Sequence, residues 1–232
     1  MDDKPENMKH GISVRFMIMC VLMTVCLISS NIFTTKVFTI WGIVLTGDLL
    51  IFPISYIIND CISEVYGYRW ARLSIWTAFI MNFLVVALAQ IVVAIPGADF
   101  WDGSEHFNYI FRMEIKVAVA SLAAFFVGST INAAVISLMK KATGGRWFWL
   151  RAIVSSIVGD LADSLIFMPI VFWPLGLKKL LLMIACQVLV KVLYETALLP
   201  VTQYVVKTLK RKEATDTFDD GISYNPFRPL DV

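Results

Sequence analysis

Charged side chains are scarce in this sequence of 232 residues, where Asp, Glu, Lys and Arg make up 16% of the chain and hydrophobic residues 58%. A water-soluble domain of this length needs more charge to cover its surface, so the composition argues against one. The mean hydropathy of +0.73 and several long apolar runs favour an integral membrane protein. The net charge of +2 is small and its charges are scattered, so a nucleic-acid partner is not expected.

Cysteine is also rare, and its four residues are Cys20, Cys26, Cys61 and Cys186. They have neither the paired spacing of a disulfide framework nor the clustering of a metal site, so we expect small packing residues. The sequence contains no Walker-type phosphate loop, which argues against ATP hydrolysis by this chain alone. We therefore expect no cofactor and no metal.

Six apolar segments approach the roughly 20 residues that a helix needs to cross a bilayer. They are expected at about Arg15–Thr35, Ile43–Cys61, Ala71–Ile95, Ile115–Met139, Phe148–Trp173 and Leu180–Val206. The predicted fold class is all-α, a polytopic bundle of six transmembrane helices within residues 15–206. A polar lead (residues 1–14) precedes this domain, and a polar tail (residues 207–232), expected to be disordered, follows it.

Lysine and arginine are distributed unevenly between the two sides of such a bundle. One side holds Lys4, Lys9, Arg15, Arg69, Arg72, Lys140, Lys141, Arg146, Arg151, Lys207, Lys210, Arg211, Lys212 and Arg228. The other holds Lys36, Arg112, Lys116, Lys178 and Lys179. Because these residues collect on the cytoplasmic side, both termini are predicted to be cytoplasmic. The predicted location is the cytoplasmic (inner) membrane, with multiple passes.

The fifth span carries four polar residues with the spacing of one helical face: Ser156, Asp160, Asp163 and Ser164. An ionisable group at mid-bilayer costs roughly 2.5–3.5 kcal/mol on insertion scales, so such groups are seldom accidental. A packing face held by hydrogen bonds would explain the pattern. A water-filled or ligand-lined cavity explains it better, because two carboxylates share the face.

The sixth span places Gln187, Lys191 and Glu195 on one stripe. Lys191 and Glu195 could neutralise each other as a structural ion pair. Alternatively, the pair also meets a substrate or a carboxylate of the fifth span.

The second span ends with Asp60 and Glu64, one helical turn apart. A solvated helix end, with Glu64 near Arg69, would explain these two acids without a function. Asp48 opens the same span, and we interpret it as a helix cap.

Proline occurs inside the three spans that carry these charges, as Pro53, Pro169 and Pro200. Proline frees a backbone carbonyl, and such breaks are tolerated where a helix lines a cavity. The coincidence predicts a polar chamber bounded by the second, fifth and sixth spans, with Asn31 of the first span at its wall.

These segments resemble the queuosine precursor transporter family, also called the vitamin uptake transporter family. The resemblance runs from about Ser29 to Pro200 and is carried by four motifs. They are Ser29-Ser30-Asn31, the stretch Asn59-Asp60-Cys61-Ile62-Ser63-Glu64-Val65-Tyr66-Gly67-Tyr68, Gly159-Asp160-Leu161-Ala162-Asp163-Ser164, and Lys191-Val192-Leu193-Tyr194-Glu195. The stretch from Asp60 to Gly67 is the most specific.

The resemblance implies an inner-membrane protein with six helices that imports deazaguanine bases, the cyano or aminomethyl precursors of the tRNA nucleoside queuosine. It suggests substrate-binding roles for Asn31, Asp60, Asp163 and Lys191, which match the family pattern, and for Glu64, Asp160 and Glu195, which resemble one of its subgroups. A guanine-like edge offers an N–H and an amino group side by side, and one carboxylate can accept from both. The expected partners are this small-molecule substrate and the lipid bilayer, and a homodimer stays open.

Two other functions remain open from the sequence. A substrate-binding subunit of an energy-coupling-factor importer also uses about six spans, but it would need partner subunits for transport. An intramembrane aspartyl protease needs two aspartates from different helices, whereas Asp160 and Asp163 lie on one helix. We therefore expect a facilitative or secondary transporter and not an enzyme.

Overall fold

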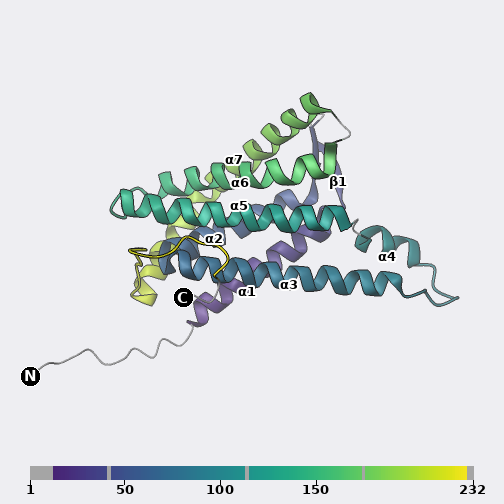
Figure 1. Ribbon diagram of the computed structural model, residues 1–232, viewed down its shortest axis with the longest axis horizontal. Coiled ribbons are helices and arrows are strands. Elements are labelled where there is room, and N and C mark those ends of the chain that lie inside the picture. The colour runs from purple at the N-terminus through teal and green to yellow at the C-terminus, as the bar shows by residue number, and fades with distance from the viewer. Residues whose placement is uncertain (1–12, 41–42, 113–114, 174–175, 229–232) are drawn as a thin grey trace, which may run out of the picture.

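The computed structural model describes residues 13–40, 43–112, 115–173 and 176–228 (Figure 1). Its elements are α1 (Val14–Phe33), β1 (Val37–Ile40), β2 (Ile43–Thr46), the 3-10 helix η1 (Gly47–Leu50), α2 (Phe52–Tyr66), α3 (Tyr68–Ala94), α4 (Ser104–Phe111), α5 (Ile115–Ala142), α6 (Phe148–Phe172) and α7 (Leu177–Glu213). In the described ranges, six helical segments are long and apolar enough to cross a membrane. The predicted six-span, all-α bundle is confirmed. The orientation of the termini stays a prediction, and the lead (residues 1–12) lies outside the described residues.

The long helices run along the long axis of the molecule, with the β1–β2 hairpin and α4 at one end and the C-terminal residues at the other (Figure 1). Large apolar side chains on α1, α3 and α7 point outward, among them Val21, Leu88 and Leu193. A bilayer would cover such a surface, whereas water would not. The polar residues of α2 and α6 instead face the interior of the bundle.

The second span starts later than the sequence suggested. Residues Ile43–Thr46, expected to open it, form strand β2, which pairs antiparallel with β1 in the register Val37↔Thr46. The hairpin contains Val, Ile and Thr, which favour strands. Helix α2 begins at Phe52 with Pro53 in its first turn, where a missing N–H costs nothing. Pro53 therefore opens the helix instead of breaking it.

The tail also differs from the disordered segment that we expected. Helix α7 continues to Glu213, and the C-terminal segment (residues 214–228) packs against α2, α3 and α5. Buried Asp219 accepts a hydrogen bond from the backbone N–H of Tyr68 at 2.9 Å, and Trp76 Nε1 donates to the carbonyl of Pro226 at 2.7 Å. Polar groups of the segment thus satisfy a backbone donor at the start of α3 and a side-chain donor two turns farther along it. Residues 229–232 lie outside the described chain.

Helices α5 and α6 pack closely at Gly159, which faces Tyr56 of α2 as well. A Cβ atom at Gly159 would lie 2.9 Å from the Cβ of Asn132 and 3.0 Å from Cε1 of fully buried Tyr56. Small residues allow transmembrane helices this close approach. The glycine therefore sets the spacing of the helices that carry the polar face.

Replacing Gly159 with Ala is expected to lower the free energy of unfolding by about 1–3 kcal/mol, because the added methyl group overpacks the contact. Thermal unfolding in detergent, followed by circular dichroism, measures the change. Val158→Ile is the matched control, because it adds one carbon at the preceding position, where the residue is 39% exposed on the outside of the bundle. Equal melting temperatures for the two variants would contradict the close packing.

Candidate functional site

A pocket, which we call the Lys191 pocket, opens between the ends of α1, α2, α5, α6 and α7 nearest the hairpin. It holds about 500 Å³ of space, part of which is open to the outside. Its lining residues are Ser30, Asn31, Thr34, Thr46, Asp48, Phe52, Ser121, Asp163, Phe167, Phe172, Gln187 and Lys191. Small-molecule sites combine apolar walls with a few precisely placed polar groups. This pocket has both properties.

One ammonium group lies between two carboxylates at the base of this pocket. Lys191 Nζ donates a hydrogen bond to Asp163 Oδ2 at 2.8 Å and lies 3.7 Å from Asp160 Oδ1. The same nitrogen is 4.3 Å from the ring centre of Phe52, within the range of a cation–π contact. Two carboxylates of α6 thus face a single ammonium group. Asp48 adds a further carboxyl group, whose Oδ1 is buried without a partner in the described chain. Such a pocket favours a ligand that donates hydrogen bonds.

Asn31 lies at the wall of the pocket and is held from two neighbouring helices. Its Nδ2 donates to Asn82 Oδ1 on α3 at 3.0 Å, and its Oδ1 accepts from Ser121 Oγ on α5 at 2.8 Å. The amide is therefore fixed in orientation, and one N–H of Nδ2 and one lone pair of Oδ1 remain for a ligand.

A second, smaller opening, which we call the Glu195 cavity, lies farther along α2, α6 and α7. It holds about 270 Å³ of space, part of which is open to the outside, and Asp60, Ser156, Glu195, Thr196 and Thr202 supply polar groups between apolar side chains. Asp60 and Glu195 are both buried. Along α7, Glu195 is one turn from Lys191, so the two openings are neighbours on the same helices.

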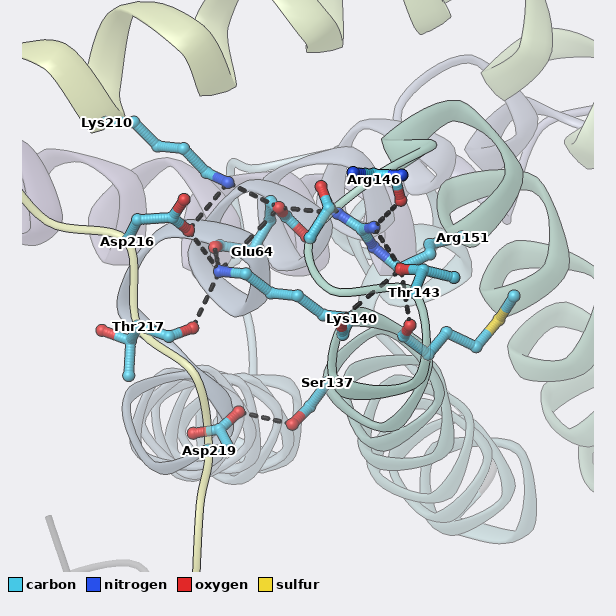
Figure 2. A network of polar contacts seen from close by, with 12 residues as sticks. Glu64, Ser137, Lys140, Thr143, Arg146, Arg151, Lys210, Asp216, Thr217 and Asp219 are labelled. Atoms are coloured by element: carbon cyan, nitrogen blue, oxygen red, sulfur yellow. Dashed lines mark hydrogen bonds and ion pairs between the residues drawn. The ribbon is translucent and has the colours of Figure 1, made fainter.

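A third polar group, the Glu64 cluster, lies at the end of the bundle away from the hairpin. The Oε1 atom of fully buried Glu64 accepts from Arg151 Nη2 at 2.8 Å and from Lys210 Nζ at 2.6 Å. Lys140 Nζ lies 3.9 Å from the same oxygen and donates to the Glu64 carbonyl at 2.6 Å. Figure 2 shows these side chains converging on Glu64. The alternative of a solvated helix end is therefore wrong for Glu64.

Asp216 of the C-terminal segment joins this cluster, accepting from Lys140 at 2.5 Å and from Lys210 at 2.8 Å (Figure 2). Partial burial raises the pKa of Asp216, but the hydrogen bonds and charges of the two lysines outweigh burial, so its pKa lies below the ordinary value. The cluster thus connects α2, α5, α6, α7 and the C-terminal segment through ion pairs.

The residues predicted from the sequence fall into these three places. Asn31, Asp163 and Lys191 line the Lys191 pocket, and Asp160 lies beside Lys191. Asp60 and Glu195 line the Glu195 cavity, and Glu64 lies in its own cluster. The four polar residues of the fifth span all face inward, as their spacing predicted: Ser156, Asp160, Asp163 and Ser164.

Two expectations about partners need correction. Lys191 does not neutralise Glu195, because the ion pairs of its ammonium group are with Asp163 and Asp160 in the described chain. Asp48, expected to be a helix cap, instead lines the pocket. Its position ahead of Pro53 offered no periodic signal that could have shown this. Ser121, alone among apolar neighbours of α5, was missed for the same reason.

Comparison with known proteins places this geometry in context. The sequence profile of the family described as "Putative vitamin uptake transporter" matches residues 46–205. The chain is 27% identical over 150 residues to a protein named "Probable queuosine precursor transporter" from Bacillus subtilis (strain 168), covering 64% of each chain. It is 26% identical over 148 residues to the "Queuosine precursor transporter" of Escherichia coli (strain K12), covering 62% of this chain and 63% of that one.

A third relative, named "Probable queuosine precursor transporter", comes from Haemophilus influenzae (strain ATCC 51907 / DSM 11121 / KW20 / Rd). It is 23% identical over 128 residues, covering 55% of this chain and 52% of that one. The chain therefore matches less than two thirds of the length of each of these three relatives. No solved structure matches the chain.

Proposed function

The chain belongs to the family described as "Putative vitamin uptake transporter", and from this premise and the Lys191 pocket we propose that it imports a queuosine precursor, a deazaguanine base. The family is one of transporters and not of enzymes. With its six spans, the chain is a multi-pass protein of the cytoplasmic membrane. The names of the relatives support the substrate class.

The observation that carries the proposal is the set of acceptors and rings in the Lys191 pocket. Asp163 uses one lone pair of Oδ2 for Lys191, so Oδ1 and the remaining lone pair of Oδ2 can accept from the N–H and amino group of a guanine-like edge. Phe52, Phe167 and Phe172 supply flat apolar walls for a flat ring. Lys191 would point to the carbonyl of the base while Asp160 keeps it oriented.

We propose direct substrate contacts for Asn31, Asp163 and Lys191, with Asp160 positioning Lys191. The geometry supports no direct contact for the other three acids that the family pattern suggested. Asp60 and Glu195 line a different cavity, and Glu64 is enclosed by cations. A base bound near Lys191 would meet none of these three in the arrangement observed.

The purified chain, reconstituted alone in proteoliposomes, is expected to take up a radiolabelled cyano-deazaguanine base. Guanine and queuine serve as competitors, and protein-free vesicles serve as the control. Bound label without translocation would indicate a binding subunit of an energy-coupling-factor importer instead. Neither binding nor uptake would contradict the proposed substrate class.

A further inference from the structure

The Glu195 cavity contains two buried acids that the substrate pocket does not use. Asp60 is 3% exposed and Glu195 is 7% exposed. Within the described chain, Oδ1 of Asp60 and both carboxyl oxygens of Glu195 make no hydrogen bond of ordinary geometry, although the Asn132 amide approaches Asp60 and the Ser156 hydroxyl approaches Glu195. Both side chains line the cavity, together with the hydroxyl groups of Ser156 and Thr202. A buried polar atom without a partner needs an explanation, such as a water, an ion or a functional role.

The cations near these acids are already paired. Lys191 is held by Asp163 and Asp160, while Arg151 and Lys210 are held by Glu64. The titratable and charged neighbours of the two acids are Tyr56 and Glu64 on α2, Asp160 on α6 and Lys191 on α7. The Asn132 amide on α5 is a further polar neighbour. More acids than bases therefore surround the cavity. An ionised carboxylate is stable in such an interior only with a cation.

The chemistry of the cavity favours a proton over a metal ion as that cation. Hard metal ions take about six or more oxygen ligands. The described residues contain no group of three or more His, Cys, Asp or Glu side chains placed to hold a metal ion. Apart from the hydroxyl group of Thr196, the rest of the lining is apolar, with Ile57, Val192 and Leu199 among its members. A proton needs only one carboxylate oxygen and tolerates apolar neighbours.

The position of the cavity connects it to the substrate pocket. Asp160 lies four residues, one helical turn, after Ser156 of the cavity on the same buried face of α6. Asp160 is also 3.7 Å from Lys191, which in turn holds Asp163. A change of charge in the cavity therefore alters the balance at Lys191, and binding of base at Asp163 alters it from the other side. Binding at the two places is thermodynamically linked.

We propose that Asp60 and Glu195 form a binding site for a coupling proton, separate from the substrate pocket; this rests on the proposed function. One carboxylate takes a proton from the outer solution, forming an O–H bond, and releases it to the cytoplasm after the base has crossed. The import of the base is then driven by the proton gradient. On the predicted orientation, the cavity lies between the outward pocket and the Glu64 cluster, on the path of the proton.

The test uses the full chain in proteoliposomes that contain a pH-sensitive dye, with radiolabelled cyano-deazaguanine base outside. An inwardly directed gradient of one pH unit is expected to raise the accumulation of base by about tenfold if one proton accompanies each base. The dye should report proton entry that depends on the base. In Glu195→Gln and Asp60→Asn, the ratio of uptake with the gradient to uptake without it should fall to one. Asp220→Asn, which removes an exposed carboxylate, should behave like the unchanged chain.

Each result decides between defined alternatives. If the unchanged chain takes up base at a rate that does not depend on the pH gradient, or that depends only on a sodium gradient, the proton site is overturned and the proposed function stands. Gradient-driven uptake that survives in both folded variants also overturns the site. Absence of uptake by the unchanged chain overturns the proposed function, and the proton site with it. Two variants are used so that misfolding of one does not decide the matter.

Discussion

Replacing Asp163 with Ala is expected to reduce deazaguanine uptake by roughly 100-fold or more, while the protein still inserts and folds. Hydrogen bonds to charged groups contribute about 1.5–3 kcal/mol each, and the proposed edge contact loses two of them. Folding should survive because Lys191 keeps a second carboxylate, that of Asp160, 3.7 Å away. Initial rates of uptake of labelled base by cells that express equal amounts of each variant measure the effect.

Lys191→Met should reduce both uptake and folding stability more than Asp163→Ala does. It removes the cation that Asp160 and Asp163 share, and it leaves two like charges close together in the interior. We expect no uptake and a lower melting temperature in detergent. Lys212→Met is the matched control, because the same chemical change at an exposed position should leave both readouts unchanged. Uptake by Asp163→Ala at the unchanged rate would remove Asp163 from the proposed substrate contacts.

The spans were predictable because each depends on a long run of apolar residues, a signal that survives without tertiary information. The start of the second span was not. Ile43–Thr46 is as apolar as a helix, and only pairing with Val37–Ile40 makes it a strand. The order of the C-terminal segment was not predictable for a similar reason. Asp219 and Pro226 of the tail bind Tyr68 and Trp76, which are far away in the sequence. Such contacts leave no local periodicity in the tail that could predict its structure.

The polar face of α6 was predictable because helical geometry alone places Asp160 and Asp163 on one side. The partner of each charge was not predictable. Lys191 could reach Glu195 on its own helix or the acids of α6, and only the packing of α6 against α7 decides for α6. The same limit hid the partner of Glu64, since Arg151 is far away in the sequence. Spacing predicts which side chains share a face, but not what that face meets.

The Glu64 cluster gives the second large expected effect, this time on stability. Glu64→Gln should lower the free energy of unfolding by about 3–5 kcal/mol, because removing one partner of a buried ion pair leaves uncompensated charge. Here Arg151 and Lys140, both nearly without solvent exposure, would lose the carboxylate that they share. Thermal unfolding in detergent, followed by circular dichroism, measures the loss.

Arg151→Met should cost less than Glu64→Gln, because Glu64 keeps Lys210 at 2.6 Å and Lys140 at 3.9 Å. This order separates a shared centre from a simple pair, for which either change would cost the same. Arg15→Met is the control, because it removes an ion pair with Glu213 in which the arginine side chain is 47% exposed; such pairs contribute about 1 kcal/mol or less. If Glu64→Gln melted at the temperature of that control, Glu64 would not be the centre that holds the ends of α2, α5, α6 and α7 together. If instead Arg151→Met were the more damaging change, the charge of Glu64 would depend on the arginine alone, and the two lysines would serve Asp216.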